Sequence, residues 1–163
     1  MRYTVRNANV EDLPVILDIY AYARSFMAQN GNPNQWGKTN PPKEQLLEDI
    51  QRRVLFVLED ESGIHGVFYF AQEVDPTYAV IEDGSWLSDS SYGVIHRIAS
   101  DGSGGIFSEA VNYCRSHSDH LRIDTHHDNH IMQKVVAKHG FSRRGIIYIA
   151  DGSPRIAYEW ILG

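Results

Sequence analysis

The sequence has a single cysteine, Cys114, and no apolar run long enough to cross a membrane. No disulfide can form within the chain, and a transmembrane helix is not expected because it would need about 18 consecutive apolar residues. Residues 1–10 also lack the apolar stretch of a secretory signal. These absences predict a cytoplasmic protein without a membrane partner.

Positive charge is scarce as well. Lysine and arginine number 15 against 21 aspartate and glutamate residues, which gives a net charge of −6. Binding to a phosphate backbone normally requires an excess of basic residues. Nucleic acid is therefore not an expected partner, whereas the acidic balance is compatible with an amine.

The residues that are present suffice for one hydrophobic core. Apolar residues make up 42% of 163 residues, so residues 1–163 are predicted to form a single domain. Hydrophobic periodicity predicts an α/β fold in the order β-α-α-β-β-β-α-β-α-β-β. The predicted helices begin after residues 9, 42, 105 and 130, and the predicted strands cover residues 3–6, 54–58, 66–71, 92–99, 121–125, 141–150 and 155–161. Residues 78–81 are a candidate for one more short strand.

The strand over residues 92–99 alternates along its length. Successive side chains of a strand point to opposite faces. The pattern therefore predicts two faces, with Val94, His96 and Ile98 on one and Ile95, Arg97 and Ala99 on the other. His96 is then expected beside Ile98.

A glycine-rich turn, residues 100–105, separates this strand from an amphipathic helix. Backbone N–H groups at a helix N-terminus carry partial positive charge, and glycines let an anion come close. The unit therefore suits a phosphate or pyrophosphate, although a flexible connecting loop would have the same composition. Neither the dinucleotide fingerprint nor a Walker A motif is present.

The segment from Asn129 to Ser142, NHIMQKVVAKHGFS, follows a predicted strand. Together with the order of the elements, it resembles the N-x-x-A-x-x-x-Y-x-K-x-G-F segment of the GNAT superfamily of acyl-CoA-dependent N-acetyltransferases. The resemblance implies a mixed, mostly antiparallel sheet of six to seven strands flanked by about four helices. It also implies transfer of an acetyl group from acetyl-CoA to an amine by direct attack.

The resemblance also implies roles for particular residues. Ile98 and Ala99 would pair with the pantetheine arm through their backbone, and Asn129 would lie near the cofactor. Gly104 and Gly105, with Ile106 after them, would lie under the pyrophosphate.

Two departures from the family pattern stand out. Asp101 or Gly102 replaces the usual basic or amide residue of the pyrophosphate loop, which is therefore degenerate. Val136 takes the place of the tyrosine that often protonates the departing thiolate, and valine has no proton to give.

Three residues are candidates for the general base that removes the ammonium proton: His96, Glu73 and His126. A core histidine satisfied by a hydrogen bond is an equal interpretation of His96. Trp36 and Trp86 are candidates for substrate contact, and each would equally suit a role in packing a loop onto the core.

The segment from Asp124 to His130 is dense in histidine and carboxylate. A metal-dependent enzyme using Asp124, His126 and His130 is one interpretation, and a solvated loop with a helix cap is another. Because no second ligand pair has a typical spacing, no metal is expected. A protein of this fold that binds a ligand or partner without acetyl transfer is a further alternative. The acceptor is expected to be a small-molecule or peptide amine, and a homodimer is compatible with the resemblance.

Overall fold

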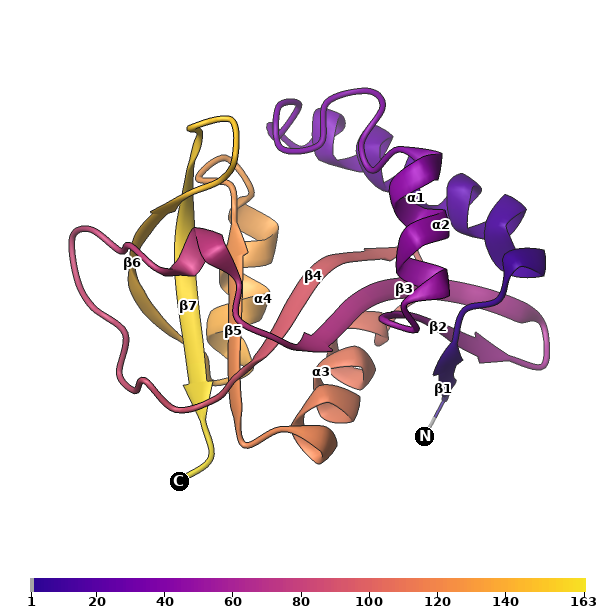
Figure 1. Ribbon diagram of the computed structural model, residues 1–163. Coiled ribbons are helices and arrows are strands. Elements are labelled where there is room, and N and C mark those ends of the chain that lie inside the picture. The colour runs from indigo at the N-terminus through magenta and orange to yellow at the C-terminus, as the bar shows by residue number, and fades with distance from the viewer. Residues whose placement is uncertain (1) are drawn as a thin grey trace.

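The computed structural model describes residues 2–163, which form a seven-stranded sheet with helices on both faces (Figure 1). The strand order is β1-β2-β3-β4-β5-β7-β6, and all neighbours are antiparallel except β4 and β5. The strands are β1 (Thr4–Asn7), β2 (Leu55–Asp60), β3 (Gly63–Gln72), β4 (Gly93–Ser100), β5 (His120–Thr125), β6 (Ser142–Tyr148) and β7 (Pro154–Ile161). The predicted mixed, mostly antiparallel sheet is confirmed.

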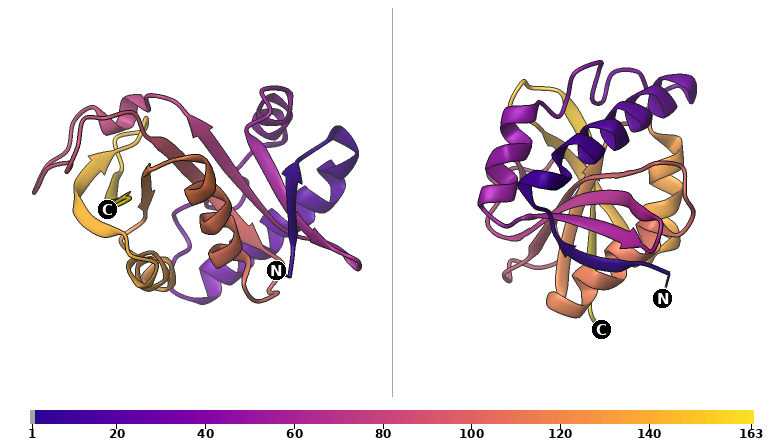
Figure 2. Two further views of the ribbon diagram at one scale, coloured as in Figure 1. Left: turned by 90° about the horizontal axis from the view of Figure 1, so that it is seen from below. Right: turned by 90° about the vertical axis from the view of Figure 1, so that its right-hand side faces the viewer.

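The four helices are divided between the two faces of the sheet, as Figure 2 shows. They are α1 (Leu13–Gln29), α2 (Lys43–Gln51), α3 (Ile106–His117) and α4 (His130–Lys138). On one face, Ile16 and Tyr20 of α1 pack with Val57 and Val67 of the sheet. On the other face, apolar residues of α3 and α4 pack against Ile95 and its neighbours. In α1 the predicted stripe is buried at Leu13, Ile16 and Tyr20, together with Ile19 and Ala23, whereas α4 buries only Val136.

The parallel strands β4 and β5 stay together only briefly. Their ladder consists of Gly93 opposite Leu121 and Val94 opposite Arg122. Beyond these pairs the two strands diverge (Figure 1). From Ile95 onward, the edge of β4 that faces β5 has no strand partner, so its backbone groups are available to a ligand.

A β-bulge interrupts β4 at Arg97. Tyr69 lies opposite His96 and Val67 lies opposite Ala99, so β4 contains one more residue than β3 over this stretch. Arg97 has a φ of 53°, in the left-handed region. A bulge of this kind reverses the alternation of the strand that carries it.

The bulge overturns the prediction that His96 and Ile98 share a face. Ile98 packs in the same cluster as Ile95, on the side of α3. His96 instead lies against the rings of Tyr69 and Tyr78. The extra residue at Arg97 therefore puts the two side chains on opposite faces of β4.

The candidate strand at residues 78–81 is also wrong. The chain forms a 3₁₀ helix there, η2 (Pro76–Tyr78). The only other 3₁₀ helix within residues 2–163, η1 (Val10–Asp12), lies directly before α1. Asp75 caps η2 by accepting a hydrogen bond from the Thr77 N–H at 2.9 Å, and Tyr78 is buried. Proline fits the first position of such a turn because it has no N–H to donate.

Among residues 2–163, no helix is both long enough and apolar enough to span a bilayer.

Candidate active site

A cleft of about 380 Å³ opens where β4 leaves β5, between α1, α3 and α4. We call it the α3 cleft. The residues that line it include five of the six predicted cofactor residues, namely Ile98, Ala99, Gly105, Ile106 and Asn129. The sixth, Gly104, does not line the cleft. Its carbonyl accepts hydrogen bonds from Tyr3 Oη at 2.7 Å and Arg2 Nη1 at 2.9 Å.

The glycine turn leads into α3 through Gly105, which is the N-cap residue with a φ of 83°. Glycine suits this left-handed conformation, in which other residues are strained. The first backbone N–H groups of α3 have no partner within the helix and can bind an anion. No charged side chain lines the α3 cleft within residues 2–163, so an anion there would depend on backbone N–H groups and on neutral donors such as Ser103.

Asp101, the acidic residue in the degenerate glycine turn, is hydrogen-bonded to Ser103 and His65. Its carboxylate accepts hydrogen bonds from the Ser103 N–H at 3.0 Å and from His65 Nδ1 at 2.7 Å. Burial raises the pKa of Asp101, but these hydrogen bonds outweigh burial and lower it. The hydrogen bond to Asp101 in turn raises the pKa of His65. The negative charge therefore faces His65 instead of the α3 cleft.

A second cleft, of about 290 Å³, contains His96, and we call it the His96 cleft. It meets the α3 cleft, and four residues line both: Met27, Ile98, Asn129 and Met132. The two clefts are therefore neighbours along β4, at the bulge of the strand.

His96 is hydrogen-bonded to a carboxylate that the sequence analysis did not single out. Its Nε2 lies 2.8 Å from Asp75 Oδ2. Burial favours a raised pKa for Asp75, but hydrogen bonds from His96 and Thr77 outweigh it and lower the pKa to about 2. The ionised carboxylate is an acceptor, so Nε2 carries the proton and Nδ1 has the lone pair. Nδ1 lies 3.9 Å from Asp124, whose Oδ2 accepts a hydrogen bond from the buried Tyr78 hydroxyl at 2.7 Å.

The other two candidate bases do not line either cleft. Glu73 accepts hydrogen bonds from Arg52 at 2.9 Å and from the Tyr69 hydroxyl at 2.6 Å. His126 accepts a hydrogen bond at Nδ1 from the Asp128 N–H at 3.0 Å. Burial, with help from Arg155, lowers the pKa of His126. Of the three, only His96 lies where an acceptor could be bound.

The two tryptophans have different positions. Trp36 lines the His96 cleft and also packs edge-on against Tyr20, with the ring centres 5.4 Å apart. Trp86 lines neither cleft, because it packs on Tyr78 and under the guanidinium of Arg122. Trp36 thus lies where both of its interpretations place it, on the wall of a cleft and packed on the core, whereas the position of Trp86 matches the packing interpretation.

Sequence reasoning missed several polar residues of the His96 cleft, three of which bear on its chemistry. Asp75 and Arg155 line it, and Gln35 closes it by accepting hydrogen bonds from Asn32 at 2.9 Å and Asn129 at 3.0 Å. Asp75 precedes a proline and a threonine, which is a local sign of a capped turn. No local pattern links Gln35 or Arg155 to His96.

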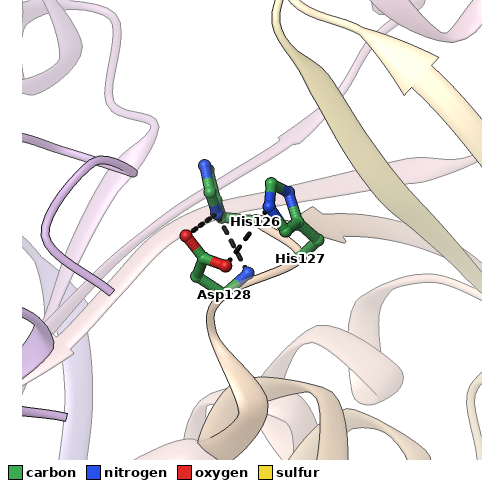
Figure 3. A group of neighbouring side chains, drawn as sticks. All are labelled: His126, His127 and Asp128. Carbon is green, nitrogen blue, oxygen red and sulfur yellow. Dashed lines mark hydrogen bonds and ion pairs between the residues drawn. The ribbon is translucent and has the colours of Figure 1, made fainter. Parts of the chain in front are cut away.

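The histidine-rich segment brings together His126, His127 and Asp128, whose nearest ligand atoms lie within 4.8 Å of one another (Figure 3). The trio proposed from the sequence is not assembled, because Asp124 binds Tyr78 and α4 begins only at His130. His126 Nδ1 already accepts the Asp128 N–H, so it could bind a metal only after that hydrogen bond breaks.

Comparisons with known proteins bear on the fold. No protein-family model and no curated protein matches the sequence. Solved structures do match over nearly the full chain. A GNAT-family acetyltransferase from Streptococcus agalactiae 2603 superposes with a TM-score of 0.86 at 24% identity, covering 99% of this chain and 96% of its own. The chain has the GNAT fold.

Two further GNAT-fold comparisons are more distant in sequence. An acetyltransferase of the GNAT family from Listeria monocytogenes 4b F2365 has a TM-score of 0.72 at 17% identity, covering 98% of this chain and 95% of its own. A protein from Salmonella typhimurium, solved with its cofactor acetyl-CoA, has a TM-score of 0.63 at 13% identity, covering 100% and 95%.

Within this GNAT fold, Val136 lies on α4 and is completely buried. It packs in the apolar cluster of α3 and the sheet. Valine therefore serves as a core residue at the position where the family resemblance leads one to expect a tyrosine.

Proposed function

We propose that this chain transfers an acetyl group from acetyl-CoA to an amine, which attacks the thioester directly. The observation that carries the proposal is the junction of the two clefts at Ile98 and Asn129, with His96 on the same strand. A donor in one cleft and an acceptor in the other would meet at this junction. Most of the rate enhancement would then come from holding the two reactants together.

The residues of the α3 cleft fit acetyl-CoA. The unpaired edge of β4 beyond Val94 offers backbone groups to the amides of the pantetheine arm. The N-terminus of α3 offers backbone N–H groups to the pyrophosphate. Apolar residues such as Phe107 and Val135 form a wall for the arm. When bound, acetyl-CoA supplies the activated acetyl group as a thioester.

His96 is the proposed base. As the amine nitrogen bonds to the acetyl carbon and the carbon–sulfur bond breaks, Nδ1 takes the proton of the amine, directly or through a water. Asp75 orients the ring and stabilises the imidazolium that forms. Because Val136 has no acidic proton, the departing thiolate takes its proton from solvent.

The test has two stages. Saturation with acetyl-CoA at a hundredfold over its dissociation constant should add about 2.7 kcal/mol of stability, a rise in melting temperature of roughly 5–10 °C for a domain of this size. ATP is the control nucleotide and should give no comparable shift. A panel of amines is then screened for release of free thiol from acetyl-CoA.

If neither acetyl-CoA nor CoA raised the melting temperature, the proposal would be overturned. A shift without thiol release for any amine would support the alternative of a GNAT-fold binding protein. Elemental analysis of the purified protein completes the test, because stoichiometric zinc or iron would direct attention to His126, His127 and Asp128.

A further inference from the structure

The His96 cleft contains a buried cation that has no anionic partner. Arg155, on β7, lines the cleft and is only 6% exposed. No carboxylate among residues 2–163 lies within 4.0 Å of its guanidinium. Its hydrogen bonds go only to backbone carbonyls, those of Pro154 at 2.9 Å and Gln35 at 3.5 Å. Several of its five N–H donors therefore remain available.

A buried guanidinium of this kind needs an explanation, because removing a charge from water without pairing it is costly. Burial lowers the pKa of Arg155, although the charges of Asp124 and Asp151 partly oppose this effect. The other arginine of the same cleft, Arg97, forms an ion pair with the buried Asp49. Unlike Arg97, Arg155 thus forms no ion pair within residues 2–163.

The opposite charge is found at the other side of the same cleft. Asp75 and Asp124 flank His96, at 2.8 Å and 3.9 Å from its two ring nitrogens. An amine approaching His96 Nδ1 thus enters a negatively charged environment, which favours its ammonium form on binding. The cleft therefore contains two carboxylates beside the base and a guanidinium that interacts electrostatically with Asp124 but forms no ion pair with either carboxylate.

We infer that the acceptor is a small zwitterion that carries its amine and a carboxylate close together, of which a free α-amino acid is the simplest example. This inference rests on the proposed function and names its substrate class. The carboxylate would bind Arg155, for which planar two-point pairing is especially favourable. The volume of about 290 Å³ is just below the ~300–1,000 Å³ typical of small-molecule pockets, which favours a small acceptor. A peptide N-terminus fits less well because an uncharged amide follows its amine.

The test measures binding to the protein in excess CoA, which occupies the donor side without reacting. The twenty L-amino acids are titrated by calorimetry, and the tightest binder is compared with its carboxamide and its decarboxylated amine. We expect at least one amino acid to bind about tenfold or more tightly than both derivatives, as loss of a charge-assisted hydrogen-bonded pair should produce.

Three variants localise the effect. Arg155→Gln should reduce the ratio of acid to amide affinity to about one, and Arg155→Lys should give an intermediate ratio because it keeps the charge without the planar fork. Arg144→Gln is the matched control, since Arg144 lies on the neighbouring strand β6 and lines neither cleft. It should leave the ratio unchanged.

The inference is overturned if no amino acid binds, if the carboxamide binds as tightly as the acid to the unaltered protein, or if the ratio survives in Arg155→Gln. The comparison of acid with amide on the unaltered protein decides the matter even if a variant does not fold. Failure of the proposed function has a different signature, since an amino acid would then bind through Arg155 without releasing thiol from acetyl-CoA.

Discussion

The hydrogen bond between His96 Nε2 and Asp75 Oδ2, 2.8 Å long, determines which nitrogen of the imidazole is free. Because the pKa of Asp75 is lowered to about 2, its carboxylate is ionised at any pH at which the protein would work. The ring must then donate from Nε2, which leaves Nδ1 as the proton acceptor. Asp75 is therefore a positioning residue for His96.

The first prediction concerns this pair. His96→Ala should lower kcat by about 10²-fold or more, the usual contribution of a general base, and should leave the affinity for acetyl-CoA unchanged. Asp75→Asn should lower kcat as well, because an amide can hold the ring in the wrong tautomer. Steady-state kinetics across a range of pH should show an altered profile for Asp75→Asn, which a purely structural role would not produce.

Glu73→Gln is the control for these substitutions. Glu73 is a carboxylate near the end of β3 whose hydrogen bonds go to Arg52 and Tyr69, outside both clefts. Its kcat should stay within about twofold of the unaltered protein, in line with the small effects typical of surface substitutions. If Glu73→Gln reduced turnover and His96→Ala did not, Glu73 would replace His96 as the base.

The sequence predicted the elements well because their signals are local. Apolar or alternating runs with turn-forming residues nearby mark most of the strands, and helical spacing marks α1 through residues such as Ile16 and Tyr20. The bulge at Arg97 gives no such signal, because the alternation simply continues through it in the sequence. Its left-handed backbone is held by the fold, in part through the Tyr20 hydroxyl, which donates to the Arg97 carbonyl at 2.8 Å.

The site was predictable only in part for the same reason. One wall of the α3 cleft consists of a strand, a turn and a helix that follow one another in the chain, so the family resemblance placed Ile98 and Gly105 on it. The His96 cleft is assembled from segments far apart in the chain, such as Asp75 and Arg155. Pairing between β5 and β7 brings Asp124 opposite Ala157, two residues from Arg155. This strand pairing decides which buried charged residues lie near one another, and no local sequence pattern indicates it.

The second prediction compares two glycines that have nearly the same positive φ. Gly105 at the start of α3 has a φ of 83°, and Gly152 in the turn before β7 has a φ of 85°. Neither Cβ would meet an atom closer than 3.4 Å, so alanine at either position should cost about 1–2 kcal/mol through backbone strain alone. Chemical denaturation should show similar losses of unfolding free energy.

The two variants should differ in their affinity for acetyl-CoA. Gly105→Ala disturbs the backbone N–H groups that begin α3, so its dissociation constant should rise about fivefold or more, consistent with losing one or two charge-assisted hydrogen bonds. Gly152→Ala lies in the β6–β7 connection and should bind as the unaltered protein does. Equal dissociation constants for both variants would show that the N-terminus of α3 does not hold the cofactor.

The third prediction concerns His65, which links the glycine turn to the β2–β3 hairpin. Its Nδ1 lies 2.7 Å from Asp101 and its Nε2 lies 3.0 Å from Asp60. Hydrogen bonding to Asp101, and then to Asp60, raises the pKa of His65 in the folded protein. The group therefore stabilises the fold fully below its unfolded pKa of about 6.5, and this contribution is lost as the pH rises through the higher folded value.

The measurement is the unfolding free energy of the unaltered protein and of His65→Gln at about pH 5.5 and about pH 9. The difference between the two proteins should be larger at the lower pH, by less than about 1 kcal/mol because the pair is near the surface. His117→Gln is the control, since His117 is exposed and its imidazole contacts no carboxylate, with hydrogen bonds to Tyr113 and Ser116. If the effect of His65→Gln grew toward high pH, the imidazolium would not be the form that the two carboxylates stabilise. The hydrogen bonds around Asp101 would then act equally well with a neutral ring, and the turn before α3 would be held independently of pH.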